Sequence, residues 1–225
     1  MKGLKFLFNS WTKMTFFFWF GIVFSLAGAV LPFIFHNAPN AEEYMFPKIF
    51  IYFPSLFLTE IGLICGCRDI AANKLVRSFP IAKELYTKSV PLFVMILTVG
   101  VSVITVTAYF IFLGITGAEA AQFADTLIIG ALVIAPELIA SGFLANIPGG
   151  GVLGVYVVAL PIVLIATIGG NTVMRTGFGV SLLTAILIFA AAVAVSVALM
   201  FVIAGRRYQK SNIKINNMVM NYETK

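Results

Sequence analysis

Six predominantly apolar runs, each long enough to cross a lipid bilayer as a helix, dominate the sequence. A helix needs about 20 predominantly apolar residues to cross roughly 30 Å of hydrocarbon. The runs cover residues 14–35, 47–66, 89–113, 125–145, 151–170 and 178–204. Strands of a membrane barrel would instead alternate apolar and polar residues over about ten positions. We therefore expect an all-α membrane protein with six transmembrane helices.

The composition leaves little room for a water-soluble domain. Hydrophobic residues make up 60% of the 225 residues and charged residues 11%. That is more apolar surface than a soluble fold of this size can bury. We expect residues 14–204 to form one transmembrane domain, and we see no sign of a separate globular domain at either end.

The lysines and arginines predict the orientation of the chain in the membrane. With a cytoplasmic N-terminus, 13 of the 15 basic residues lie inside: in segment 1–13, in the loop 67–88 and in the tail 205–225. This distribution satisfies the positive-inside rule and puts both termini in the cytoplasm. The net charge of +6 then reflects topology and attraction to anionic lipid headgroups, not nucleic-acid binding.

The first 13 residues form a short amphipathic segment. Leu4, Leu7, Phe8 and Trp11 recur at helical spacing, with the polar residues largely on other faces. This spacing is typical of a helix that lies in the plane of the membrane interface. The alternative is a frayed basic lead-in to the first span.

The loop 67–88 carries an apolar group within a strongly charged segment. Leu75, Val76 and Phe79 lie close together in the sequence, beside Pro80. Such a group suits a groove in a soluble partner. A solvated loop whose charge merely fixes topology is the alternative, and the composition alone favours neither.

A family resemblance appears in the same loop. Asp69 precedes the sequence SFPIAKE (Ser78 to Glu84), and Lys88 opens the next apolar run. This pattern resembles that of ABC-2 type transporter permeases, particularly the short bacterial ones, which also have six spans and both termini inside. The chain departs from the pattern at Phe79, where leucine is usual. It also has little of the re-entrant hairpin that many longer members carry before helix 6.

The resemblance implies that the loop contains a coupling helix, which fits a cleft in a separately encoded ATPase. Two permease chains, expected as a homodimer, and two ATPases would form an exporter in the bacterial cytoplasmic membrane, with ATP and Mg bound by the ATPases and no cofactor in this chain. Packing contacts are then expected from Leu75, Val76 and Phe79 beside Pro80, and polar contacts from Arg77, Lys83 and Glu84.

The sequence has no nucleotide-binding or hydrolytic motif of its own. It contains no phosphate-binding GxxxxGK[ST] loop, no HExxH and no GxSxG. We therefore expect neither a catalytic nor a metal site, and a subunit that is not itself an enzyme. The expected function is export of an amphipathic peptide or hydrophobic compound. The alternative is an ATP-independent secondary carrier or channel.

Two carboxylates lie inside the predicted spans. Glu60 belongs to the second run and Glu137 follows Pro136 in the fourth. An ionised side chain at the centre of a span costs at least about 2.5–3.5 kcal/mol, so neither is expected to face lipid. They either line a pathway for a cationic or amphipathic substrate, or are protonated or hydrogen-bonded between helices.

Small residues predict where helices meet. Ser55, Thr59, Gly62 and Gly66 recur at helical spacing along the second run. Small side chains allow helix backbones to approach closely within a membrane. We expect this face to contact a neighbouring helix.

Overall fold

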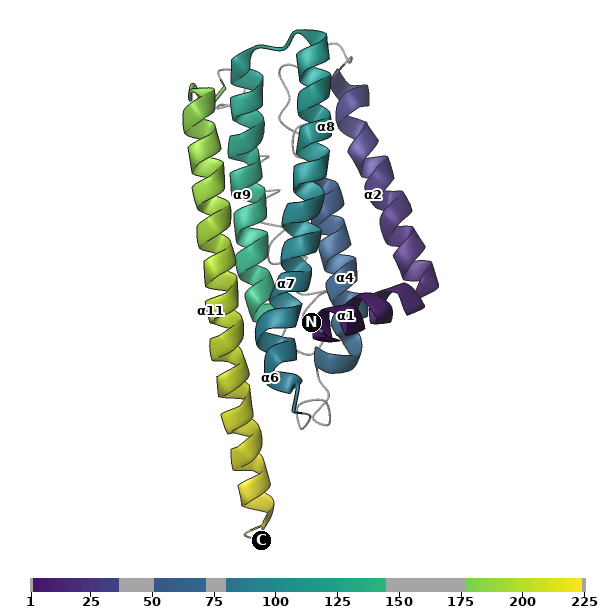
Figure 1. Cartoon of the computed structure of the whole chain (residues 1–225), viewed down its shortest axis with the longest axis vertical. Coiled ribbons are helices and arrows are strands. Elements are labelled where there is room, and N and C mark those ends of the chain that lie inside the picture. Colours follow the sequence, from purple (N-terminus) through teal and green to yellow (C-terminus); the bar gives the residue numbers. More distant parts are fainter. Residues whose placement is uncertain (1, 37–50, 72–79, 145–176, 224–225) are drawn as a thin grey trace.

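The computed structural model describes residues 2–36, 51–71, 80–144 and 177–223. Within these ranges the chain is almost entirely helical and has no strand (Figure 1). Three helical stretches are long and apolar enough to cross a membrane: Ala82–Thr116, Ala120–Gly142 and Leu182–Gln209. The prediction of an all-α chain with apolar helices is confirmed at this level.

The structure does not show the other predicted spans as full-length membrane helices. Helix α2 (Thr15–His36) and helix α4 (Phe53–Ala71) contain the shorter apolar stretches Phe18–Ala27 and Phe53–Leu63. The fifth predicted span, 151–170, lies outside the described residues. Six spans therefore remain a prediction.

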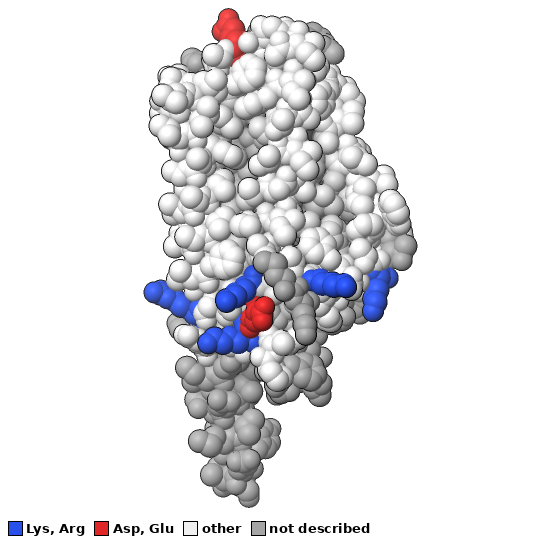
Figure 2. All heavy atoms as spheres, in the orientation of Figure 1, with Lys and Arg blue, Asp and Glu red and all other residues white. Residues whose placement is uncertain are grey.

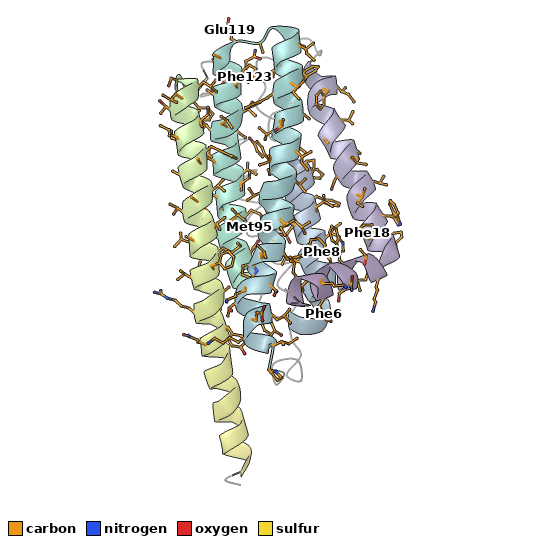
Figure 3. All side chains as sticks on the ribbon, viewed as in Figure 1. Phe6, Phe8, Phe18, Met95, Glu119 and Phe123 are labelled. Atoms are coloured by element: carbon orange, nitrogen blue, oxygen red, sulfur yellow. The ribbon has the colours of Figure 1, made fainter. Side chains whose placement is uncertain are left out.

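Helix α1 (Lys2–Lys13) lies across the bundle at one end (Figure 1). Leu7 and Trp11 are buried against the other helices, whereas Lys5 and Lys13 are exposed, as the apolar spacing predicts. Figure 3 shows Phe8 on the side of α1 that faces the bundle. Its ring packs edge-on against Phe93, with ring centroids 4.8 Å apart. One face of α1 is thus a packing surface, and its placement at a membrane interface remains a prediction.

The third predicted span is longer in the structure than expected. One continuous helix runs over Ala82–Thr116, and we call it the composite helix. It comprises α6 (Ala82–Glu84), a π turn η2 (Leu85–Ser89), α7 (Val90–Met95), a second π turn η3 (Ile96–Gly100) and α8 (Val101–Thr116). The loop between α4 and the composite helix is therefore shorter than the predicted 67–88, because α4 extends to Ala71 and residues 82–88 are already helical. Hydropathy marks only the apolar part of a helix. Residues 82–85 (AKEL) are good helix formers, so the helix begins before its apolar part.

Pro91 explains the first of the two π turns. Proline has no backbone N–H, and its ring clashes with the carbonyl four residues earlier in a regular helix. In the turn just before Pro91, the N–H of Val90 donates to the carbonyl of Leu85, five residues back. The wider turn accommodates the proline without ending the helix.

Helices α9 (Ala120–Leu144) and α11 (Leu182–Glu223) form the most extensive helix pair (Figure 1). Their backbones approach closely at Gly142, where an added Cβ would lie 2.9 Å from the carbonyl oxygen of Met200. The turn before α11 is tied to α9, because the N–H of Phe178 donates to Asp125 Oδ1 at 3.0 Å. Helix α11 continues through most of the predicted tail 205–225 and projects beyond the bundle.

The described basic side chains form a band around one end of the bundle, at the level of α1 (Figure 2). All of them are exposed: Lys5, Lys13, Lys83, Lys88, Arg206 and Arg207. We call this the basic band. Glu119 lies at the opposite end, in the turn between α8 and α9 (Figure 3). Among the described residues of the face in Figure 2, those between the two ends are uncharged.

Candidate polar site between the helices

Four buried hydroxyl groups join α4 to the composite helix. Thr59 Oγ1 lies 2.8 Å from Thr98 Oγ1, and Ser102 Oγ donates to Ser55 Oγ at 2.8 Å. Each helix contributes two residues four positions apart, so both pairs lie on one face. The predicted contact along Ser55 and Thr59 is confirmed, and the composite helix is the neighbour.

The donors and acceptors of this cluster can be assigned. Thr59 and Ser55 each donate to a backbone carbonyl earlier in the chain. Thr59 donates to the carbonyl of Ser55 and Ser55 to that of Tyr52, at 2.7 Å in both cases. A hydroxyl carries only one proton, so the hydroxyl of Thr98 must donate to Thr59. Both bonds between the helices then run from the composite helix to α4. These hydroxyls are satisfied within the protein, as buried polar groups normally are.

Gly62 allows the two helices to approach just beyond this cluster. A Cβ built on Gly62 would lie 2.5 Å from Leu97 Cδ1 and 3.2 Å from Phe93 Cε1. The predicted small-residue face thus extends from Ser55 to Gly62. Sequence reasoning missed Thr98 and Ser102, although their spacing of four residues, equal to that of Ser55 and Thr59, was a usable signal.

Tyr52 connects the start of α4 to α9. Its hydroxyl donates to the carbonyl of Thr126 at 2.7 Å, and the side chain is fully buried. The ring lies over Gly130, where any Cβ would collide with it. Helix α4 is therefore held on one side by the composite helix and on another by α9.

The structure brings together the two carboxylates of the predicted spans. The carboxyl groups of Glu60 on α4 and Glu137 on α9 lie close enough to interact electrostatically. Glu60 is 7% exposed and Glu137 is 3% exposed. Neither faces the surrounding solvent or lipid, as expected. Their pairing was not predicted, because spacing within one helix gives no information about contacts between two helices.

The carboxylate pair lacks the partners that the hydroxyls have. Apart from the contact between the two carboxyl groups, both oxygens of Glu60 and Oε1 of Glu137 are without a hydrogen-bond partner among the described residues. Every lysine and arginine whose side chain is described is exposed, so none of these is buried beside the pair. Two like charges buried together without a counter-charge are strongly unfavourable. A positive charge, carried by a proton or another cation, must therefore accompany the pair.

The predicted ATPase contacts are described only in part. Pro80, Lys83 and Glu84 are exposed at the end of the bundle that carries the basic band. Beside them Ile81 is 51% exposed, an apolar residue that the sequence analysis did not single out. The remaining predicted contacts lie outside the described residues: Leu75, Val76, Arg77 and Phe79.

Comparisons with known proteins leave the family open. No protein-family model, no curated protein and no solved structure matches the chain. Within the described residues, no group of three or more histidine, cysteine, aspartate or glutamate side chains could hold a metal ion.

Proposed function

We propose that the chain is the transmembrane permease subunit of an ATP-binding cassette exporter. Two permease chains and two separate ATPases form the complex, and the ATPases bind ATP and Mg. One observation carries the proposal: four exposed residues, Pro80, Ile81, Lys83 and Glu84, stand at the start of the composite helix, at the end that carries the basic band. A soluble partner can reach this position, and the helix behind it extends to Thr116.

The composite helix supports a mechanical role for that contact. A push at Ile81 or Lys83 acts on the first turn of a helix that contains two π turns, η2 and η3. Such turns are often found at functional sites within helices. Thr98 belongs to η3 and meets Thr59, so movement there would reach α4 directly. We expect ATP-driven closure of the ATPases to switch the permease pair between inward-facing and outward-facing states.

The charge distribution supports the proposed topology. We place the basic band on the cytoplasmic side and Glu119 outside, in the bacterial cytoplasmic membrane. In this topology α1 lies at the level of the headgroups, and its exposed Lys5 and Lys13 support that placement. This arrangement requires six spans and cytoplasmic termini.

An apolar interior with one carboxylate pair suits a substrate that is itself amphipathic. Most buried side chains of the described bundle are hydrocarbon, and the hydroxyls between α4 and the composite helix are already satisfied. Glu60 and Glu137 are the buried acidic groups of the described residues. An amphipathic peptide or a hydrophobic compound, particularly a cationic one, fits these properties better than a highly charged solute.

Transport into inverted membrane vesicles tests the proposal. Vesicles from cells that express the chain together with its neighbouring reading frames are given a fluorescent cationic amphipathic peptide as the probe. We expect uptake that requires ATP and is lost when the chain is omitted. Uptake that proceeds equally with a non-hydrolysable ATP analogue would exclude the proposal.

A second candidate function is an ATP-independent carrier. The specific observation that favours it is the buried Glu60–Glu137 pair, because ionisable groups inside a span commonly serve ion coupling. The same vesicle assay separates the candidates. A carrier would take up the probe without the ATPase, driven by an imposed ion gradient.

A further inference from the structure

We propose that Glu60 and Glu137 form a binding site for one monovalent cation, either an inorganic ion or the ammonium group of an organic molecule. The site lies between α4 and α9, inside the described bundle. It is distinct from the ATPase contact and does not require one. The inference therefore stands whether the chain works as a permease subunit or as a carrier.

Burial and missing partners carry the inference. Both residues are more than nine-tenths buried, and apart from the contact between the two carboxyl groups, three of their four oxygens have no hydrogen-bond partner among the described residues. The nearby hydroxyls provide the contrast, because Thr59, the residue before Glu60, is fully satisfied by Ser55 and Thr98. The protein thus satisfies the neutral polar groups here and leaves the acidic oxygens unsatisfied. Carboxylate oxygens in that condition are suited to accept a cation.

The charge of the pair indicates which cation it takes. The fully ionised pair carries two negative charges, and retaining one shared proton reduces this to one. A single monovalent cation then makes the site neutral, which a buried site requires. Binding to the doubly protonated pair releases one proton for each cation that enters, so the total charge is unchanged.

The donor set argues against a divalent ion. Calcium takes six to eight oxygen ligands, and magnesium demands near-ideal octahedral geometry. The described residues provide no third acidic side chain, histidine or cysteine near enough to complete such a set. An ammonium group needs no more acceptors than it has N–H donors, and any monovalent cation brings half the charge that a divalent ion would bring into the buried site.

Thermal unfolding of the purified full-length chain tests the site. The reference buffer contains N-methylglucamine chloride, whose bulky polar cation should not enter a buried site. Sodium, potassium or methylammonium chloride then replaces it at constant ionic strength. We expect a saturable rise in Tm with at least one of them, about 3 °C or more at roughly ten times its Kd. The double variant Glu60→Gln/Glu137→Gln should abolish the rise, and the exposed control Glu119→Gln should retain it.

The outcomes decide whether the site exists and which kind of cation it binds. A rise with sodium or potassium assigns an inorganic ion, and a rise with methylammonium alone assigns an organic ammonium group. The proposal is overturned if none of the three cations raises Tm above the reference. It is equally overturned if the rise persists in the double variant Glu60→Gln/Glu137→Gln. Because no ATPase is present, failure here leaves the proposed exporter function untouched.

Discussion

The hydroxyl oxygens of Thr59 and Thr98 lie 2.8 Å apart and connect α4 to the composite helix inside the bundle. Thr98 belongs to the π turn η3, where the helix departs from regular geometry. A second bond, from Ser102 to Ser55, lies one turn away. The irregular part of the composite helix is therefore also the part that α4 holds in place.

Removing these hydroxyls should show their coupling. We expect Thr59→Val and Thr98→Val each to cost about 0.6–2 kcal/mol, since each leaves a buried partner without its bond. The double variant should cost less than the two single variants together. Thermal unfolding of the four proteins in a double-mutant cycle measures this. Thr107→Val, at an exposed position of the same helix, is the matched control and should leave Tm unchanged. Strict additivity of the two changes would contradict the observed bond.

Alanine at two helical glycines should have opposite effects. At Gly62 the new Cβ would meet Leu97 at 2.5 Å, so we expect a lower Tm. At Gly114 nothing lies within 4 Å, so alanine should stabilise by about 0.5–1 kcal/mol through helix propensity. If Gly62→Ala stabilises as much as Gly114→Ala, α4 and the composite helix do not pack as described.

Helix α1 offers a test within a single helix. Leu7 is fully buried, and its replacement by alanine should cost about 2–5 kcal/mol through loss of packing. Phe6, the preceding residue, is 45% exposed, and Phe6→Ala should leave the thermal stability nearly unchanged. Equal effects of the two variants on Tm would show that α1 does not pack against the bundle through this face.

The carboxylate pair should reduce stability when no small cation is present. In N-methylglucamine chloride we expect Glu60→Gln/Glu137→Gln to have a Tm at least as high as that of the unmodified chain. The change removes two buried carboxyl groups that the folded protein must keep protonated, whereas the unfolded chain ionises them in neutral buffer. Glu84→Gln, at an exposed position, serves as the control and should not change Tm. A loss of several degrees in the double variant would mean that the pair stabilises the fold, and the electrostatic argument would be wrong.

The sequence predicted which face of a helix is buried better than it predicted where helices begin or which helices meet. Apolar periodicity placed Leu7 and Trp11 on the buried face of α1, because burial within one helix follows its own spacing. The predicted span 89–113 begins later than the composite helix, which starts at Ala82, because charged residues such as Lys83 and Glu84 resemble a loop in hydropathy although they are good helix formers. The meeting of Glu60 with Glu137 could not be predicted, since it depends on how α4 and α9 pack against each other.

The most direct test of the proposed function is purification of the full-length chain after co-expression with the products of its neighbouring reading frames. The account predicts a complex with equal numbers of permease and ATPase chains that hydrolyses ATP. Val76→Ala/Phe79→Ala should lose the ATPase, and Glu119→Ala at the opposite end should retain it. A chain that purifies alone and moves the peptide probe in vesicles free of ATP would contradict the account.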